Sequence, residues 1–408
     1  MNQNTRPEET RRDREPGDTH AGTAVMTPQA YDVIVMGGGP AGAAAGSQLA
    51  KAGWQVLVVE RTSYHTCRVG ETLPPRARIS LAQLGVVDRM HESGHLHAPS
   101  TVCVWGDATP RWNDFITNPY GHGWHIDRAR FDRMLADECR ARGASLVEGV
   151  KAGHCTHVNG GWRVSLHAGR RQAEEHVSCR FLVDATGRGP RKIQPSTLPV
   201  IYDQLVGIAA LYDECGDGAS DGSTLIEAGS HGWWYSARLP DERCLAIFMT
   251  DADLAHGGRG GFKAFLQRQL REARFTSERV RPIPEAKSIA VWSAATSMNA
   301  SVCGADWLLT GDAAMTRDPL SGEGICQALE SGIEAAYAID GALRGNEDAI
   351  GRYGRAVREQ FDDYLKSHAH YYFAEQRWRD FPFWARRHAL LERTPRGRTE
   401  QSGQQAIA

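Results

Sequence analysis

The chain has 408 residues, of which 41% are hydrophobic and 24% are charged, and its formal net charge is −2. This composition is typical of a soluble globular protein with more than one domain, and it argues against a protein that coats nucleic acid. The nine cysteines form no CxxC pair, so a zinc ribbon or a disulfide scaffold is not expected and a cytoplasmic setting is predicted. No apolar run approaches the roughly 18 residues of a membrane-spanning helix.

The N-terminal part of the chain predicts a disordered leader followed by a βαβ unit. Residues 1–30 are highly charged and lack the apolar core of a signal peptide. Ordered structure is expected from Tyr31, with an apolar strand over 33–36, an Ala-rich helix over 40–52 and a second strand over 56–59. A strand, a glycine turn, a helix and another strand within about 30 residues are the pattern of a βαβ unit.

The turn inside this unit has the GxGxxG pattern of a dinucleotide site. The predicted cofactor-binding residues of the turn are Gly37, Gly39, Ala41 and Gly42. The first glycine permits the tight turn, the second lets the backbone approach a pyrophosphate, and the third lets the helix pack on the sheet. The N-terminus of the helix adds free N–H groups and a partial positive charge.

An acidic residue follows the second strand at the position that a dinucleotide site requires. Glu60 lies 23 residues after Gly37, where a carboxylate accepts hydrogen bonds from an adenosine ribose, and Arg61 beside it is included in the predicted site. GxGxxG alone also occurs in plain glycine turns. The strand, the helix and the acidic residue in register favour the dinucleotide interpretation.

The later part of the chain alternates between buried strands, glycine turns and helices. The expected elements, in chain order, are a loop over 70–75, a helix from Pro75 to Leu84, a helix over 127–142, a strand over 181–184, a β-rich region over 201–292, a strand over 307–310, a helix over 322–342 and an aromatic helical segment to about 391.

A second glycine-rich turn decides between FAD and NAD. The strand over 307–310 ends at Asp312, and the segment 318–324 then opens a helix. Together with the first motif, this resembles the FAD-binding pattern of flavoprotein monooxygenases that share the para-hydroxybenzoate hydroxylase fold. The resemblance implies that Asp312 bonds the ribityl chain and that the helix start at Gly322 and Gly324 points at the flavin pyrimidine ring. It also implies that Arg128, which opens a long helix, contacts FAD.

Two further segments resemble the halogenase-like branch of these flavoproteins. The segment 67–74 looks like the strap of flavin-dependent halogenases and related tryptophan hydroxylases, which runs between flavin and substrate. The segment 232–240 resembles the substrate-sheet strand of the same branch. The resemblance covers about residues 31–387. It implies an α/β fold with a Rossmann-like FAD-binding domain, a β-sheet substrate domain and a C-terminal helical region.

The expected domain limits follow from these assignments. The predicted parts are a leader (1–30), a discontinuous FAD-binding domain (31–200 and 300–340), a β-rich substrate domain (201–299), C-terminal helices (341–391) and a disordered tail (392–408).

Two departures from the halogenase pattern favour hydroxylation over halogenation. Halogenases carry a Trp-x-Trp-x-Ile-Pro stretch, whereas this chain has Trp233-Trp234-Tyr235 at a different spacing. They also carry a Lys in the strand region after the strap, whereas no Lys occurs between Lys51 and Lys151. The missing ammonium group removes the usual carrier of hypohalous acid.

The predicted reaction is therefore hydroxylation of an electron-rich aromatic ring, such as a peptide- or carrier-bound tryptophan or indole. The resemblance implies that NADH or NADPH reduces FAD, and that O₂ then forms a flavin hydroperoxide that attacks the ring. A flavin reductase is a further candidate partner, and the substrate is an aromatic small molecule, a carrier-tethered group or a peptide. The alternatives are a flavin-dependent halogenase and a reductase or dehydrogenase of the geranylgeranyl-reductase type.

Candidate site residues for this chemistry are aromatic or proton-accepting. Trp233, Trp234 and Tyr235 are expected to line the substrate pocket, although packing of a sheet core explains them equally well. Glu71 and Glu323 are candidate proton acceptors, with a structural role for Glu71 as the alternative.

Histidines and cysteines give weaker signals. His125, together with His122, is a candidate general base, with surface or packing histidine as the alternative. The five histidines between 91 and 125 lack the spacing of a metal motif such as HExxH, so no metal site is predicted. Cys67 and Cys326 are expected to be small buried hydrophobes rather than redox thiols.

Overall fold

The computed structural model describes residues 30–393 except 66–69, 159, 170–174, 191, 194–197, 217–221, 256–260, 281–285 and 287. The predictions for the leader before residue 30, for Cys67 and for the tail beyond residue 393 lie outside these residues.

The larger sheet contains the predicted βαβ unit and is mostly parallel. Its strands run in the order β19-β20-β11-β1-β2-β8, with β10 beside β11 and β9 beside β10. The bounds are β1 (Ala30–Met36), β2 (Val56–Glu60), β8 (Ser145–Glu148), β9 (Val150–Val158), β10 (Gly161–Ala168), β11 (Glu175–Asp184), β19 (Cys303–Gly304) and β20 (Trp307–Leu309). Strands β1 and β2 are apolar along nearly their whole length because both faces of the sheet are covered.

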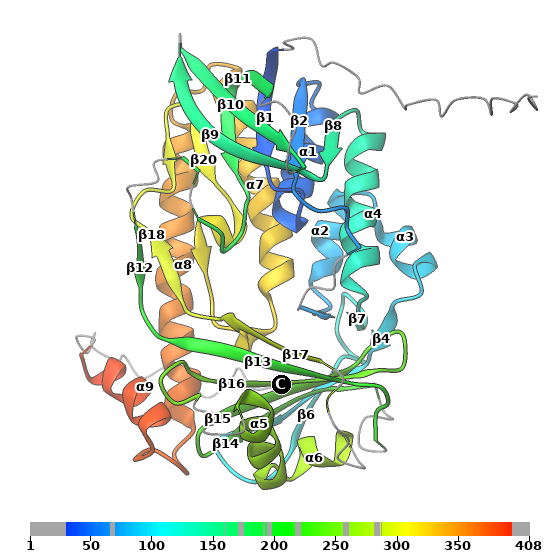
Figure 1. Ribbon diagram of the computed structural model, residues 1–408, viewed down its shortest axis with the longest axis vertical. Coiled ribbons are helices and arrows are strands. Elements are labelled where there is room, and N and C mark those ends of the chain that lie inside the picture. The colour runs from blue at the N-terminus through cyan, green and yellow to red at the C-terminus, as the bar shows by residue number, and fades with distance from the viewer. Residues whose placement is uncertain are drawn as a thin grey trace, which may run out of the picture.

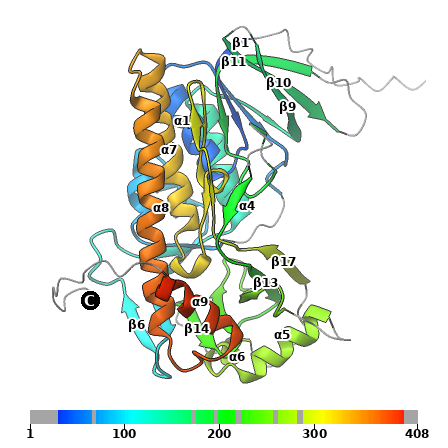
Figure 2. The ribbon, with the colours of Figure 1, turned by 90° about the vertical axis from the view of Figure 1, so that its left-hand side faces the viewer.

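Helices cover one face of this sheet. Helix α1 (Pro40–Lys51) contacts both α4 (Arg128–Ala141) and α7 (Gly324–Leu343), and α7 carries the long α8 (Ala349–Ala374) on its outer side. Figure 2 shows α1, α7 and α8 stacked on one side, with the β9–β10 hairpin on the other. The predicted helix over 127–142 is confirmed, with Asp127 as its N-cap accepting a hydrogen bond from Arg130 N at 3.0 Å.

A second sheet lies at the other end of the molecule (Figure 1). Its strands run in the order β17-β13-β16-β15-β14-β5-β6. The bounds are β5 (Ser100–Val104), β6 (Arg111–Asp114), β13 (Leu205–Tyr212), β14 (Thr224–Gly229), β15 (Gly232–Arg238), β16 (Cys244–Asp251) and β17 (Ser288–Ser293). The β-rich prediction for 201–292 is thus confirmed in its strands.

Two features of this second sheet differ from the expectations. The helices α5 (Gly261–Glu272) and α6 (Phe275–Arg279) interrupt the predicted β-rich region and cover the outer face of the sheet. Strands β5 and β6 also belong to this sheet, because β5 pairs in parallel with β14, although the predicted limits assign them to the FAD-binding domain. The domain limits therefore stay a proposal, with residues 100–114 moved to the substrate side.

Two small sheets and the remaining helices join the layers. One small sheet has the order β12-β18-β21 and the other the order β3-β7-β4. The bounds are β3 (Thr72–Leu73), α2 (Ala77–Gln83), α3 (Val87–Glu92), β4 (Leu96–Ala98), β7 (Gly123–His125), β12 (Pro199–Ile201), β18 (Ser297–Asn299), β21 (Met315–Thr316) and α9 (Pro382–Arg393), with short 3-10 turns η3 (Gly311–Ala313) and η4 (Pro319–Ser321). Helix α2 begins at Ala77 rather than at the predicted Pro75, since residues 75 and 76 form a turn.

A buried carboxylate joins the long helix α8 to the turn before α7 and, through Tyr372, to β15 of the second sheet. Asp318 accepts hydrogen bonds from Tyr372 Oη at 2.7 Å and Leu320 N at 2.8 Å, and its Oδ2 lies 3.2 Å from His368 Nε2. Tyr372 in turn accepts a hydrogen bond from Trp233 Nε1 on β15 at 2.9 Å. Burial raises the pKa of Asp318, but the donors outweigh it and hold the pKa below its ordinary value.

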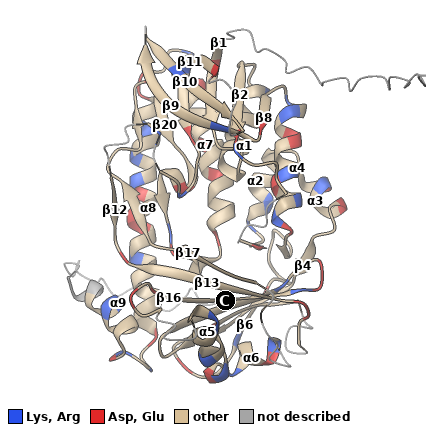
Figure 3. Cartoon of the chain, viewed as in Figure 1, with Lys and Arg blue, Asp and Glu red and all other residues tan. Residues whose placement is uncertain are grey.

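The surface carries both signs of charge. Figure 3 shows Lys and Arg interspersed with Asp and Glu along α4 and α8. None of the described helices combines the length and the apolar character needed to cross a membrane.

Helices α1 and α7 approach so closely that a side chain between them has no room. A Cβ at Gly332 would lie 2.2 Å from the carbonyl oxygen of Ala41. We expect Gly332→Ala to lower the free energy of unfolding by about 1–3 kcal/mol, since the overpacking outweighs the higher helix propensity of alanine. Urea denaturation measures this. Gly324→Ala in the same helix is the control, because a Cβ there meets open space, and a loss as large as that of Gly332→Ala would contradict the packing argument.

Candidate active site

The glycine turn after β1 is shaped by contacts that only glycine allows. Gly37 has φ +103°, and a Cβ there would lie 2.3 Å from the carbonyl oxygen of Ala185. A Cβ at Gly42 would lie 1.8 Å from the carbonyl oxygen of Gly37. Gly39 is the extended N-cap of α1 and offers no side-chain cap, so the first-turn amides of the helix are available to a phosphate group. This cradle fits the pyrophosphate of a dinucleotide.

Glu60 braces the glycine turn from the end of β2. It is buried, and its Oε2 accepts a hydrogen bond from Gly38 N at 2.8 Å while Oε1 accepts one from Thr62 N at 2.9 Å. The hydroxyl of Tyr64 donates to the carbonyl of Gly38 at 2.9 Å. Arg61 beside Glu60 is exposed. The contact with a ribose stays a prediction, and the structure adds the contact with the turn itself.

Ala41 has a packing role beside its predicted binding role. Its Cβ would lie 2.8 Å from a Cβ at Gly311, and its carbonyl faces Gly332 of α7. The turn after β20 and the middle of α7 therefore both meet at the first turn of α1.

Asp312 forms an ion pair that the sequence analysis did not anticipate. Its Oδ2 lies 3.0 Å from Nε of Arg188, in the turn after β11. The same guanidinium donates at 3.2 Å to the backbone carbonyls of Ser293, Ala295 and Arg317. Arg188 thus ties the turn of Asp312 to the ends of several other segments. In the sequence, the position of Arg188 is indicated only by the glycine turn at Gly187 directly before it.

The N-terminus of α7 is open to a ligand. Gly322 has φ +64°, Glu323 is the N-cap without a side-chain capping bond, and α7 begins at Gly324, two residues later than predicted. A Cβ at Gly322 or Gly324 would meet no atom within 4 Å. The backbone N–H groups at this helix end fit the predicted contact with the flavin pyrimidine ring.

Glu323 has partners that the sequence did not reveal. Its Oε1 accepts a hydrogen bond from Arg76 Nε at 2.8 Å, and Gln327 Nε2 donates to its Oε2 at 3.3 Å. Arg76 also pairs with Glu330 at 3.0 Å. Glu323 therefore joins α2 to α7, and a role as proton acceptor requires it to leave these partners.

The strap lies against β7 and the start of α4. The carbonyl of Glu71 accepts a hydrogen bond from Ile126 N at 2.7 Å, and Arg128 Nη1 donates to the carbonyl of Gly70 at 3.4 Å. Arg128 is largely buried and pairs with Asp132 at 3.2 Å. Arg128 thus supports the strap as well as standing at the predicted FAD contact. The first residues of the predicted strap, 67–69, lie outside the described residues.

Glu71 has the most perturbed carboxyl environment of the predicted site. It is 7% exposed, and within the described part of the chain its Oε2 has no hydrogen-bond partner. Burial raises its pKa from 4.5 to about 7, although Arg128 acts in the opposite direction. A carboxyl with a pKa near neutrality can both accept and release a proton at physiological pH.

Tyr235 of β15 lies over the strap. Its hydroxyl is 2.5 Å from Oγ1 of Thr72. Burial and then the charge of Glu71 raise the pKa of Tyr235 well above its ordinary value, so the phenol stays protonated. The buried carboxyl of Glu71 and the partly buried phenol of Tyr235 therefore lie near one another at the strap.

The three aromatic residues of β15 do not share one pocket. Side chains alternate along a strand, so Trp234 points to the outer face and packs on Phe248 with ring centroids 4.9 Å apart. Trp233 packs among the aromatic side chains of α8 and α9. Trp234 therefore lies on the face of β15 opposite to Tyr235, and the roles of the three residues in a substrate pocket stay predictions. Trp233 is held by the hydrogen bond from its Nε1 to Tyr372 Oη.

The structure separates the two candidate histidines. His125 is fully buried on β7, opposite Thr72 of the strap, and its Nε2 lies 3.0 Å from Oγ1 of Thr224. Its role as general base stays a prediction. His122 lies on the outer side, stacked on His97. Cys326 is buried, as predicted for a small hydrophobe.

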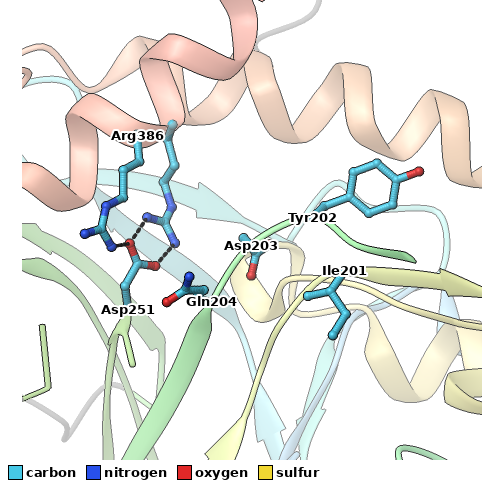
Figure 4. A pocket seen from close by; sticks show the side chains of 7 residues that line it. Ile201, Tyr202, Asp203, Gln204, Asp251 and Arg386 are labelled. Carbon is cyan, nitrogen blue, oxygen red and sulfur yellow. Dashed lines mark hydrogen bonds and ion pairs between the residues drawn. The ribbon is translucent and has the colours of Figure 1, made fainter. Parts of the chain in front are cut away.

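A pocket of about 530 Å³ lies away from the strap, between the start of β13 and α9 (Figure 4). Its lining residues are Ile201, Tyr202, Asp203, Gln204, Asp251, Arg386 and Arg387. The charged groups of Asp251, Arg386 and Arg387 are already paired at 2.9 Å, as the dashed lines of Figure 4 show in part. These ion pairs join α9 to β16, so we assign this pocket no reaction chemistry.

Comparison with known proteins agrees with the geometry of the glycine turns. Residues 30–359 match the family described as FAD binding domain. A protein of Marinomonas mediterranea named as an FAD-dependent oxidoreductase, LodB, is 29% identical over 370 residues, which cover 89% of this chain and 98% of that protein. A 1H-pyrrole-2-carbonyl-[peptidyl-carrier protein] brominase of Pseudoalteromonas luteoviolacea is 26% identical and covers 78% of this chain, with 79% of that protein.

Two solved structures are similar over most of the chain. The myxobacterial chondrochloren halogenase CndH superposes with a TM-score of 0.81 at 25% identity, covering 88% of this chain and 86% of that one. The peptidyl tryptophan dihydroxylase QhpG superposes with a TM-score of 0.71 at 25% identity, covering 88% and 79%. These similarities confirm the predicted fold class and the predicted resemblance to the halogenase-like branch.

The role of Asp312 can be measured as FAD affinity. If its carboxylate bonds the ribityl chain, Asp312→Ala loses a charged hydrogen bond worth about 1.5–3 kcal/mol and weakens FAD binding roughly tenfold to a hundredfold. Fluorescence titration with FAD gives the Kd. Asp306→Ala is the matched control, because Asp306 pairs with His157 at the opposite end of β20. An equal loss in both variants would assign Asp312 a structural role only.

The raised pKa of Glu71 predicts a pH-dependent stability difference. The pKa of this carboxyl rises from 4.5 to about 7 on folding, so the stability that its protonated form provides is lost as the pH rises through 7. We expect Glu71→Gln to be more stable than the native protein by about 3 kcal/mol at about pH 8, with little difference at about pH 4.5. Urea denaturation of the FAD-free protein at both pH values tests this.

The control for this experiment is Glu175→Gln, because Glu175 is exposed on β11 and keeps its hydration on folding. A constant difference between Glu71→Gln and the native protein at all pH values would show that Glu71 is not the titrating group.

Proposed function

The chain belongs to the FAD binding domain family and is an FAD-dependent oxidoreductase of halogenase-like type, and on that premise we propose that it hydroxylates an electron-rich aromatic ring. The proposed class is a monooxygenase that uses O₂ and electrons from NADH or NADPH. The observation that carries the proposal is the buried Glu71, which faces the Tyr235 side of the substrate sheet with a pKa of about 7.

A carboxyl of this kind suits a ring that must lose a proton. When bound, FAD supplies the activation of O₂. An indole or a phenol becomes more electron-rich as its N–H or O–H proton moves to a base. We propose Glu71 as that base, because its Oε2 is buried and has no hydrogen-bond partner among the described residues. The hydroxyl of Tyr235 stays protonated and holds the strap through Thr72.

The absence of lysine from the segment after the strap favours hydroxylation over halogenation. This segment forms β4 and β5, over Leu96–Ala98 and Ser100–Val104, and it contains no lysine. A halogenase of this branch needs an ammonium group there to handle hypohalous acid. The side chains of this chain offer no such carrier between Lys51 and Lys151.

We further propose that the ring is presented on a larger molecule. The solved relative QhpG is a peptidyl tryptophan dihydroxylase, and the brominase relative acts on a pyrrole bound to a peptidyl carrier protein. A tryptophan in a peptide and a ring on a carrier are therefore the substrate classes to test first. Electrons reach FAD from NADH or NADPH, either directly or through a separate flavin reductase.

Halogenation is the second candidate, because CndH and the brominase relative both carry that activity in their names. The two candidate reactions differ in whether they need a halide in the buffer. A hydroxylase adds one oxygen atom from O₂ in halide-free buffer, whereas a halogenase forms no product until chloride or bromide is present.

The deciding experiment combines ¹⁸O₂, FAD and NADH in halide-free buffer, with and without a flavin reductase. The probes are free tryptophan, a tryptophan-containing peptide and indole-3-carboxylate on a carrier protein, and mass spectrometry weighs the products. We expect the gain of one ¹⁸O atom per turnover. A product that forms only with added halide, and carries it, would overturn the proposal in favour of halogenation.

A variant pair then tests the proton acceptor. Glu71→Gln should lower kcat by roughly 10²–10⁴-fold, the range of general base catalysis, while FAD still binds. The matched variant Tyr235→Phe should keep most of kcat, because the phenol only holds the strap. Equal activity of Glu71→Gln and the native enzyme would remove Glu71 from the mechanism.

A further inference from the structure

Three histidines that are scattered in the sequence meet on the surface beside the small β3-β7-β4 sheet. His91 belongs to α3, His97 to β4, and His122 to the loop before β7. One ligand atom from each imidazole lies within 4.8 Å of the other two. Strands β4 and β7 pair directly, with His97 opposite Trp124, and Figure 1 shows the two strands together below α2 and α3.

The three rings lie in contact with or close to one another. His97 and His122 are stacked with centroids 3.6 Å apart, and His91 stands at nearly right angles to both, with centroids 6.2 Å away. A divalent ion with metal–nitrogen bonds of about 2.0–2.1 Å brings three ligand atoms to about 3.4 Å from one another. His91 and His97 are exposed, so their side chains have room to rotate toward a shared ion.

One imidazole is already oriented by a neighbouring group. Nδ1 of His122 lies 2.8 Å from the backbone carbonyl of Gly123. A carbonyl oxygen can only accept, so Nδ1 carries the proton and Nε2 carries the lone pair. Metal-binding histidines are commonly fixed in this way, with the second ring nitrogen donating to a carbonyl.

From this geometry we propose that His91, His97 and His122 bind a late first-row divalent ion, of which Zn²⁺ is the natural candidate. Three imidazole nitrogens form the ligand set of an open tetrahedral site, whose fourth position takes water or an anion. Arg78 lies beside the cluster, with its guanidinium 5.2 Å from the centroid of Trp124. Its positive charge opposes a bare cation at the site, so the fourth ligand is expected to be an anion such as hydroxide or chloride that offsets it.

A bound ion would hold together the elements that support the strap. The ion joins α3, β4 and the loop before β7, and the opposite edge of β7 pairs with the strap strand β3. Residues Thr72 and Leu73 of that strand lie next to Glu71. The metal therefore stiffens the support of the strap and stands apart from the glycine turns that hold FAD.

The first experiment measures stoichiometry and affinity on untagged, chelator-treated protein that has been reloaded with FAD. Isothermal titration with ZnSO₄ should show one ion per chain, and Co²⁺ should give the visible absorption bands of a tetrahedral site. His97→Ala and His122→Ala should each weaken binding by roughly tenfold or more. His176→Ala is the matched control, because His176 is an exposed histidine on β11 outside the cluster.

Each outcome decides for or against the proposal. One tight site that persists in His176→Ala and is lost in His97→Ala and His122→Ala supports it, provided that FAD binding and circular dichroism show intact folding. Zn²⁺ should also raise the melting temperature of the native protein but not of His97→Ala. Binding that is equal in all variants, or absent from the native protein, overturns it.

Discussion

The close approach of α1 and α7 is the contact on which the candidate active site depends. The carbonyl of Ala41 faces Gly332, and the Cβ of Ala41 faces Gly311, so three segments that are distant in the sequence meet at the first turn of one helix. The glycine turn after β1, the turn of Asp312 and the first half of α7 are held together by this contact. A larger side chain at any of these points would separate the two helix ends that are predicted to contact FAD.

Three buried carboxyl groups show how the surroundings assign different roles to one functional group. Glu60 and Asp318 each accept several hydrogen bonds, and both hold backbone or side-chain groups in place. Glu71 is as deeply buried, yet its Oε2 has no hydrogen-bond partner in the described part of the chain, and its pKa is raised to about 7. The hydrogen bonds to Asp318 favour its charged form, whereas at Glu71 burial outweighs Arg128 and two backbone N–H donors and favours the neutral form. Glu71 therefore has the raised pKa that its proposed role as proton acceptor requires, and the contact of Glu60 with a ribose stays a prediction.

The second sheet has two unlike faces. The outer face of β15 contributes Trp234 to a core with α5, whereas the inner face carries Trp233 toward α8 and Tyr235 toward the strap. The hydrogen bond from Trp233 to Tyr372 and the one from Tyr372 to Asp318 continue this inner face to the turn before α7. The strap, the second sheet and helix α8 are thus connected by hydrogen bonds and side-chain packing.

Local patterns in the sequence were enough to predict the βαβ unit, the glycine turn, the α4 helix and the second turn at Asp312. Each of these features is set by the residue types within a short stretch of the chain. Glycine permits the turn conformations, and the spacing of apolar residues gives the helix and strand periodicity. The amphipathic spacing of Phe265, Leu266 and Leu270 also predicts a helix, and α5 was missed because the surrounding strands dominated the pattern. The partners of charged groups were not predictable in this way. Arg188 meets Asp312, Arg76 meets Glu323, and three histidines meet beside β7 only because the tertiary structure brings distant segments together, and the burial that raises the pKa of Glu71 arises from the same packing.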